Sequence, residues 1–178
     1  VAGTADYAAL TTLVDSLAKI ASVRLRESSK PSVSVTRLRH ALKQLLVVVE
    51  PDWLDIGGAV HWHRPPGDPY VRGESHDLLQ VLLNLAYNSL RAVQGSERPS
   101  LTVRVELGQR ESTVSIIDTG PGVADVTALF HPFRPDADGT GLGLYTSRAI
   151  MRSIDGDVRH VPTPSGCRFD VIIPNAEA

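Results

Sequence analysis

The 178-residue sequence has one cysteine, few aromatic residues and no long apolar run. The single cysteine, Cys167, excludes an internal disulfide and any zinc site built from cysteines. No apolar stretch approaches the ~20 residues that a membrane-spanning helix needs. The formal net charge of -2 gives no basic excess of the kind that nucleic-acid binding requires. We therefore expect no nucleic-acid partner.

A change of pattern near Lys30 and Pro31 predicts two regions, residues 1–30 and residues 31–178. The first region has apolar residues at alternating steps of three and four, the spacing of a seam between packed helices: Tyr7, Leu10, Val14, Leu17 and Ala21. Because this pattern lasts barely three heptads, an ordinary amphipathic helix is an equally good interpretation. The polar stretch RESSKPS then predicts a hinge.

The second region mixes helical and strand patterns, which predicts an α+β fold. Strands are expected at 32–35, 58–64 and 70–73, and in two hairpins that join 101–107 to 112–118 and 157–162 to 167–174. Helices are expected at 36–50, ended by Pro51 and Asp52, at 75–95, with Ser75 as N-cap and Gly95 at the C-terminal end, and from about 143 to about 154. Hairpins with helices between them favour a helix layer on one face of a mostly antiparallel sheet.

Two asparagines interrupt the apolar pattern of the helix expected at 75–95. Asn84 and Asn88 stand four residues apart, so both amides leave the same helix face, and Arg91 follows on nearly that face. Amides in an apolar helix need hydrogen-bond partners, and bonds to neighbouring backbone are the simpler interpretation. The alternative is that the amide oxygens face a hard cation such as Mg²⁺, which prefers oxygen ligands.

A carboxylate ends an apolar strand in the stretch IIDTGPGV. Asp118 at a buried strand end needs a hydrogen-bond donor, and an exocyclic amine is one candidate. Gly120 and Gly122 would let a flat ring approach the backbone. Because Asp, Gly and Pro are also ordinary turn residues, a plain turn is the simpler interpretation for this stretch alone.

Three glycines at alternate positions open the next apolar pattern in DGTGLGLYTSRAI. The dinucleotide-binding pattern does not fit, because Leu144 follows Gly143, and the phosphate-loop pattern does not fit, because no Gly-Lys pair occurs. Bare backbone N–H groups at the start of a helix nevertheless form an anion site. A merely flexible loop would not explain the leucines at 142 and 144.

In this order, the three segments resemble the catalytic ATP-binding domain of sensor histidine kinases, in the superfamily shared with gyrase and mismatch-repair ATPases. QVLLNLAYNSLRA is similar to the asparagine box of that family, DTGPGV to the first glycine box, LFHPF to the phenylalanine box and GTGLGL to the second glycine box. The stretch DGDVRHVPTPSGCRFDVIIP resembles the closing hairpin. The resemblance covers roughly residues 31–174, and residues 1–30 resemble the end of a dimerisation helix and a hinge.

The resemblance implies a two-layer α/β sandwich, a mixed sheet of about five strands covered by about three helices, with ATP and Mg²⁺ as ligands. Asp118 would accept a hydrogen bond from the adenine amine, and Asn88, with Asn84, would hold Mg²⁺. The nucleotide-contacting residues that it implies are Asn84, Asn88, Arg91, Asp118, Gly120, Gly122, Val123, Phe133, Gly139, Thr140, Gly141, Leu142, Gly143 and Leu144. Phe130 and Phe133 would anchor a lid over the nucleotide.

Asn84 also bears on the type of reaction. By the resemblance, ATP-hydrolysing relatives carry a glutamate at this position, and an amide cannot act as a general base toward water. Together with this amide, the resemblance implies an enzyme, a protein-histidine kinase, in which Asn84 and Asn88 are catalytic and the γ-phosphoryl group passes to a histidine. Attack by an imidazole nitrogen needs no strong base, so the enzyme has only to position the reactants and neutralise charge.

The acceptor histidine of the family precedes Glu or Asp, with a proline downstream, and none of the six histidines has this setting. We therefore expect the acceptor on a dimerisation domain that precedes Val1. His61 and His63 alternate on a strand without a third ligand nearby, which favours ordinary histidines over a metal pair. The implied partners are the dimerisation domain, a response regulator and a second copy of the full-length protein. The implied location is cytoplasmic, with any membrane anchor in a part before Val1.

Two departures from the family pattern accompany the resemblance. The lid between Phe133 and Gly139 is short and has no lysine, so we expect nucleotide to exchange easily, and Cys167 stands where the family often has threonine.

Two alternative functions stay open. The heptad-like segment before residue 22 disfavours an anti-sigma-type serine kinase of the same superfamily. The intact Asn88, Asp118 and box glycines disfavour a non-catalytic nucleotide-binding module.

Overall fold

The computed structural model describes residues 34–132 and 141–176. Its elements are β1 (Val35–Arg37), α2 (Leu38–Asp55), β2 (Ala59–His63), β3 (Tyr70–Arg72), α3 (Ser75–Ala92), β4 (Ser100–Leu107), β5 (Glu111–Asp118), α4 (Gly143–Arg152), β6 (Asp157–His160) and β7 (Cys167–Pro174). The predicted region boundary near Pro31 and the helix predicted between Tyr7 and Ala21 lie outside the described residues. None of the described helices is long and apolar enough to cross a membrane.

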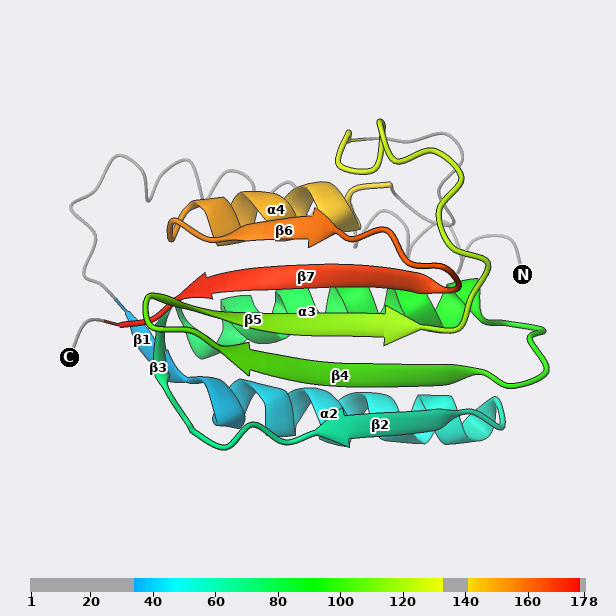
Figure 1. Ribbon diagram of the computed structural model, residues 1–178, viewed down its shortest axis with the longest axis horizontal. Helices are drawn as coiled ribbons and strands as arrows, with labels where there is room; N and C mark the ends of the chain where they lie inside the picture. The colour runs from blue at the N-terminus through cyan, green and yellow to red at the C-terminus, as the bar shows by residue number, and fades with distance from the viewer. Residues whose placement is uncertain (1–33, 133–140, 177–178) are drawn as a thin grey trace, which may run out of the picture.

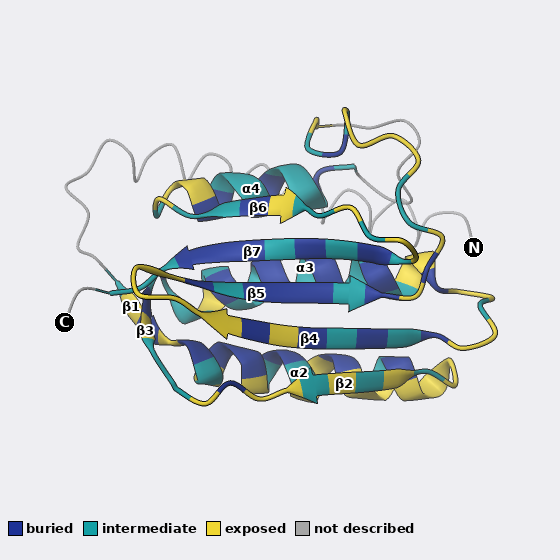
Figure 2. Ribbon diagram, in the orientation of Figure 1, coloured by how far each residue is buried: buried dark blue, intermediate teal, exposed yellow. Residues whose placement is uncertain are grey.

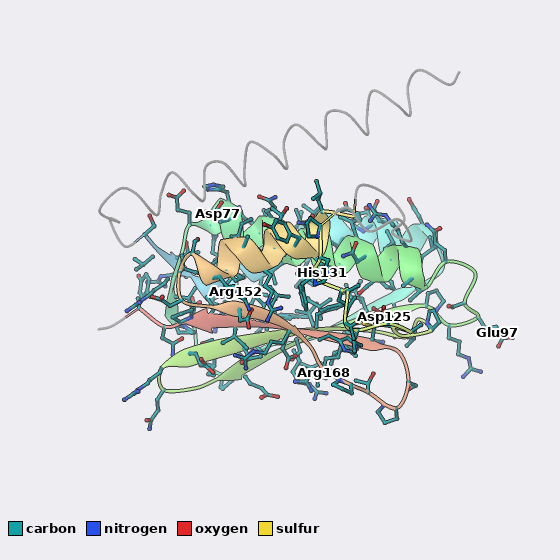
Figure 3. All side chains as sticks on the ribbon, turned by 90° about the horizontal axis from the view of Figure 1, so that it is seen from above. Asp77, Glu97, Asp125, His131, Arg152 and Arg168 are labelled. Carbon is teal, nitrogen blue, oxygen red and sulfur yellow. The ribbon has the colours of Figure 1, made fainter. Side chains whose placement is uncertain are left out.

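Five strands form one mixed sheet in the order β2-β4-β5-β7-β6, and α2, α3 and α4 cover one of its faces (Figure 1). Seen from above, the helices make one layer and the strands the other (Figure 3). The β2 and β4 strands are parallel, and the other neighbours in this sheet are antiparallel. The predicted sandwich and both predicted hairpins, β4 with β5 and β6 with β7, are confirmed.

The core lies between these two layers (Figure 2). Alternate residues of the central strands face the helices and are buried, among them Val103, Val114, Ile116, Val171 and Ile173. The facing stripe of α3 has the three-and-four spacing of an amphipathic helix: Leu78, Val81, Leu82, Leu85 and Ala86. Fully burying one large aliphatic side chain contributes about 1.5–3 kcal/mol, so this layer contact fixes α3 firmly on the sheet.

The α2 helix continues through Pro51 to Asp55, so the prediction that Pro51 and Asp52 end it is wrong. Proline lacks the N–H that would bond to the carbonyl four residues earlier, at Val47. The Val47 side chain is 75% exposed, so this missing bond lies on the solvent side of the helix, while Trp53 is buried in the core beyond it. The helix ends where the Gly57 and Gly58 N–H groups donate to Leu54 and Trp53 carbonyls.

Ser75 is the first residue of α3 and not its N-cap, which corrects the second helix prediction. The N-cap position is Glu74, without a side-chain capping bond, and the Ser75 hydroxyl donates instead to Gln44 on α2, 3.3 Å away. The short strands expected near residues 32–35 and 70–73 form as β1 and β3, and they pair as a separate two-stranded sheet that the sequence patterns did not indicate. The β1 strand leads into α2, and β3 precedes α3. Leu38, the first residue of α2, donates its N–H to the carbonyl of Pro69 just before β3.

Candidate functional site

The carboxylate of Asp118 lies at the end of β5 and is almost fully buried, with 5% of the residue exposed. Its Oδ2 accepts a hydrogen bond from the Ser89 hydroxyl of α3 at 2.7 Å, and its Oδ1 accepts one from the Gly120 N–H at 2.9 Å. A carboxylate has about four acceptor sites, so both oxygens can still accept from a ligand. Asp118 is therefore a buried acceptor at the end of β5, held against α3 by Ser89.

Two turns pack closely around this carboxylate because they contain glycine. A Cβ on Gly120 would lie 2.9 Å from Asp118 Oδ1 and 3.2 Å from the Ala92 side chain. A Cβ on Gly166, in the turn before β7, would overlap the carbonyl oxygen of Asp118, and Gly166 has a φ of 73°. These glycines allow protein segments to approach one another, in addition to any ring that approaches Gly120 and Gly122.

Cys167 is the residue directly opposite Asp118 across β5 and β7. It is buried, and burial, together with the negative charge of Asp118, raises the pKa of its thiol to about 12. The thiol is therefore neutral at physiological pH. A neutral thiol is only a weak hydrogen-bond donor.

The two asparagines bond to side chains of different elements. Asn84 Nδ2 donates to the Ser147 hydroxyl of α4 at 3.2 Å, and Asn88 Oδ1 accepts from the Arg91 guanidinium at 3.3 Å. Both asparagines are half-buried, and Arg91 is exposed. This part of α3 therefore offers amide oxygens and a guanidinium on one accessible face, a donor set suited to Mg²⁺ and phosphate.

The described part of the second glycine box leads directly into α4. Gly141 has a φ of 65°, Leu142 is the N-cap residue, and Gly143 begins the helix. Leu142 is fully buried and Leu144 packs against the core, which explains the interleaved leucines. A Cβ on Gly143 would lie 3.9 Å from Asn84 Cγ, so the helix start faces the asparagine.

The predicted residues thus fall into two neighbouring groups joined by α3. Asp118, Gly120 and Gly122 lie at the end of β5 and beside the turn before β7. Asn84 bonds to Ser147 in the middle of α4 and also faces Gly143, the first residue of that helix. Val123 and Phe130 pack against the core. Phe133, Gly139 and Thr140 lie outside the described residues.

Phe130 links the segment after the first glycine box to the rest of the fold. Its ring meets the Phe169 ring edge-on at 6.4 Å, and the Arg148 guanidinium of α4 lies 4.4 Å from its centre. Such aromatic and cation contacts each contribute on the order of 1 kcal/mol. These contacts anchor the segment next to α4 and β7. In Figure 3, the labelled Asp125 of this segment lies toward the same end of the molecule as Glu97, which is in the connection between α3 and β4.

Ser89 is a site residue that the sequence interpretation missed. It continues the buried stripe of α3, three residues after Ala86 and four after Leu85, and only 3% of it is exposed. A hydroxyl in an otherwise apolar stripe needs a partner, and this was the available signal. The partner, Asp118, lies 29 residues away in the sequence, so spacing on the helix does not reveal it.

Comparisons with known proteins agree with this arrangement. The family model of histidine kinase-, DNA gyrase B- and HSP90-like ATPases matches residues 73–177. The C4-dicarboxylate transport sensor protein DctB of Rhizobium meliloti is 32% identical over 144 residues, which are 79% of this chain and 23% of DctB. This chain therefore spans less than a quarter of the length of that relative.

Solved structures of histidine kinases have the same fold. The histidine kinase AdeS of Acinetobacter baumannii superposes with a TM-score of 0.76 and 23% identity, over 94% of this chain and 79% of that one. The histidine kinase ThkA in complex with the response regulator protein TrrA gives a TM-score of 0.69 and 22% identity, over 93% of this chain and 49% of that one. Because the family match covers more than half of the sequence, the chain belongs to the ATP-using family of histidine kinase-, DNA gyrase B- and HSP90-like ATPases.

Proposed function

We propose that this chain binds Mg-ATP and transfers the γ-phosphoryl group to a histidine on a dimerisation domain, as the catalytic part of a two-component sensor kinase. The names of its relatives support this proposal, since DctB is a sensor protein and AdeS and ThkA are histidine kinases. The observation that carries the proposal is the amide of Asn84, which stands four residues before Asn88 and bonds to Ser147 in the middle of α4.

Asn84 distinguishes transfer to a protein from hydrolysis. A glutamate at this position, as the resemblance places in hydrolysing relatives, would accept a proton from an attacking water. An amide does not accept a proton at neutral pH, and the Asn84 Nδ2 already donates to Ser147. Bound ATP therefore keeps its γ-phosphate until a nucleophile that needs no deprotonation before attack, such as a neutral imidazole nitrogen, arrives.

In the proposed site, one group of residues contacts the adenine base and another contacts the phosphates and Mg²⁺. Asp118 accepts a hydrogen bond from the adenine amine, with Gly120, Gly122 and Val123 beside the ring. Asn88, with Asn84, would hold Mg²⁺ through amide oxygens, and few protein ligands suffice because Mg²⁺ prefers to keep water and phosphate oxygens. Arg91 neutralises phosphate charge, and the phosphates lie along residues 139–144, with Phe133 in the lid.

In the proposed reaction, a ring nitrogen of the acceptor histidine attacks the γ-phosphorus with its lone pair. The new P–N bond forms while the bond from the γ-phosphorus to the bridging oxygen breaks, and that electron pair leaves with ADP. The imidazole then loses its remaining N–H proton to solvent. Mg²⁺, when bound, supplies charge neutralisation for the leaving diphosphate, and the protein residues supply positioning.

The assembly that this reaction requires extends beyond the residues that the structure describes. We propose that residues 1–30 are the end of a dimerisation helix with its hinge and that residues 31–178 are the ATP-binding domain. The full-length protein would then act as a cytoplasmic homodimer that passes phosphate to a response regulator. ThkA, which has the same fold, forms a complex with the response regulator TrrA.

The chemical linkage of the transferred phosphate tests the proposal. Incubation of the chain with Mg²⁺, γ-labelled ATP and the dimerisation domain of its full-length protein should label that domain at histidine, in a linkage labile to acid and stable to base. An acid-stable, base-labile label would instead identify a serine kinase. No label, despite measurable ADP binding, would identify a non-catalytic nucleotide-binding module.

A further inference from the structure

We propose that Ser89 is a positioning residue for base recognition, whose hydroxyl fixes the Asp118 carboxylate in the orientation that selects adenine. Ser89 supplies from α3 the hydrogen bond that a hydroxyl at position 167 would supply from β7. The inference rests on the nucleotide site of the proposed function.

The geometry leaves the Asp118 carboxylate little freedom. The Ser89 hydroxyl holds Oδ2 from the helix layer at 2.7 Å, and the Gly120 N–H holds Oδ1 from the following turn at 2.9 Å. Hydrogen bonds to an ionised acceptor are shorter and roughly twice as strong as neutral ones. Rotation of the carboxylate plane would break at least one of these two bonds, so the directions of its free lone pairs are held.

The second donor matters because the site is buried. Ser89 is 3% exposed and Asp118 is 5% exposed, so solvent has little access to replace a lost donor before a nucleotide arrives. A buried carboxylate with one oxygen unpaired is unfavourable and relaxes by rotation. A rotated carboxylate no longer presents its free lone pairs to the adenine amine and so discriminates less against the guanine carbonyl at that position.

Cys167 lies where an alternative donor would stand. Because Asp118 and Cys167 are directly opposite in antiparallel strands, their Cβ atoms are separated by about 4.5–5.5 Å on the same face of the sheet. A threonine hydroxyl at position 167 would reach the Asp118 carboxylate, whereas the neutral, buried thiol is a weak donor. A threonine at position 167 would therefore be an alternative source of the hydrogen bond that Ser89 supplies.

The test is calorimetric titration with ADP and GDP, without Mg²⁺, of the parent chain and three variants: Ser89→Ala, Cys167→Thr and the double variant. Ser89→Ala should weaken ADP binding by about tenfold and lower the ADP-to-GDP affinity ratio by a similar factor. The double variant should regain most of both losses, and Cys167→Thr alone should change little.

Ser115→Ala is the matched control, because Ser115 is a fully buried serine whose hydroxyl has no partner among the described residues. It should bind ADP as the parent does. Parent-like affinity and selectivity in Ser89→Ala, or a double variant no better than Ser89→Ala, would overturn the inference alone. A parent chain that binds no ADP, or an Asp118→Ala variant that binds ADP as tightly as the parent, would instead overturn the proposed nucleotide site.

Discussion

The two ends of the proposed nucleotide site differ in how far the protein builds them before a ligand arrives. At the base-reading end, Asp118 is buried and held by bonds of 2.7 and 2.9 Å. At the phosphate end, Asn84 and Asn88 are half-buried, their bonds are 3.2 and 3.3 Å long, and Arg91 is exposed. If the proposed site is right, the fold pre-organises the acceptor for the base, and we expect the metal and phosphate contacts to form with the ligand.

Gly166→Ala should have the largest effect on the base-reading end. The new Cβ would overlap the Asp118 carbonyl oxygen at a φ of 73°, so overpacking and backbone strain together should lower the unfolding free energy by about 3 kcal/mol. Gly57→Ala is the control, because Gly57 has a φ of 71° and nothing within 4 Å of a Cβ. It should lose only about 1–2 kcal/mol. Equal losses in urea unfolding at both positions would contradict the close packing.

Asn88→Ala should remove the phosphate end while leaving the base-reading end intact. Loss of one ligand to the metal should reduce phosphoryl transfer by about 100-fold or more, because charge neutralisation dominates this reaction. ADP binding measured without Mg²⁺ should stay near the parent value. Gln94→Ala, two residues past the end of α3 and exposed, should transfer at the parent rate. A loss of Mg-free ADP binding equal to the loss of transfer would show that the two ends are not separable.

Asp118→Ala, unlike Asn88→Ala, should weaken ADP binding even without Mg²⁺. Loss of a hydrogen bond to a charged group lowers affinity by about 1.5–3 kcal/mol, or roughly 10- to 150-fold. We expect this loss for ADP, with or without Mg²⁺, whereas the affinity of the variant for GDP should differ little from that of the parent. Calorimetric titration checks both, and unchanged ADP affinity would remove Asp118 from the site.

Acid should loosen α4, the helix that begins at the phosphate end, through Asp157. Burial would raise the pKa of this carboxyl, but hydrogen bonds from Arg148 and Arg159 outweigh it and hold the pKa at about 2, below the ordinary 3.8. Because the pKa of Asp157 is lower in the folded protein than its ordinary value, the ionised carboxylate stabilises the fold at pH values above about 4. About 2 kcal/mol of unfolding free energy should therefore be lost as the pH falls from about 4 to about 2. Asp157→Asn should remove this part of the pH dependence of the unfolding free energy. An unchanged slope would contradict the assignment.

The sequence predicted those parts of the fold that depend on neighbouring residues. Alternating strands around GQRE and TPSG indicated the two hairpins, and both form as expected. The end of α2 was mispredicted because proline is a local signal, whereas burial of Trp53 is a tertiary effect that outweighs it. Pairing of β1 with β3 joins residues more than 30 positions apart, and no short pattern encodes it.

In the candidate site, too, local sequence patterns predicted some features and tertiary contacts determine others. The spacing of Asn84 and Asn88 on one helix face, and the place of Asp118 at a strand end, were readable as patterns. The role of Ser89 was not, because a serine in a helix looks ordinary until the fold places it 2.7 Å from Asp118. The close approach of Gly166 to β5 likewise depends on sheet pairing and not on local sequence.

The most direct test of the account is steady-state release of inorganic phosphate from Mg-ATP by the chain alone. With an amide at Asn84 and no acceptor supplied, the chain should hold ATP and release phosphate at a negligible rate. Addition of the dimerisation domain should then consume ATP only in proportion to the histidine labelled. Brisk phosphate release by the chain alone, comparable to that of a dedicated ATPase, would contradict the kinase proposal and place the protein in the hydrolytic branch of its family.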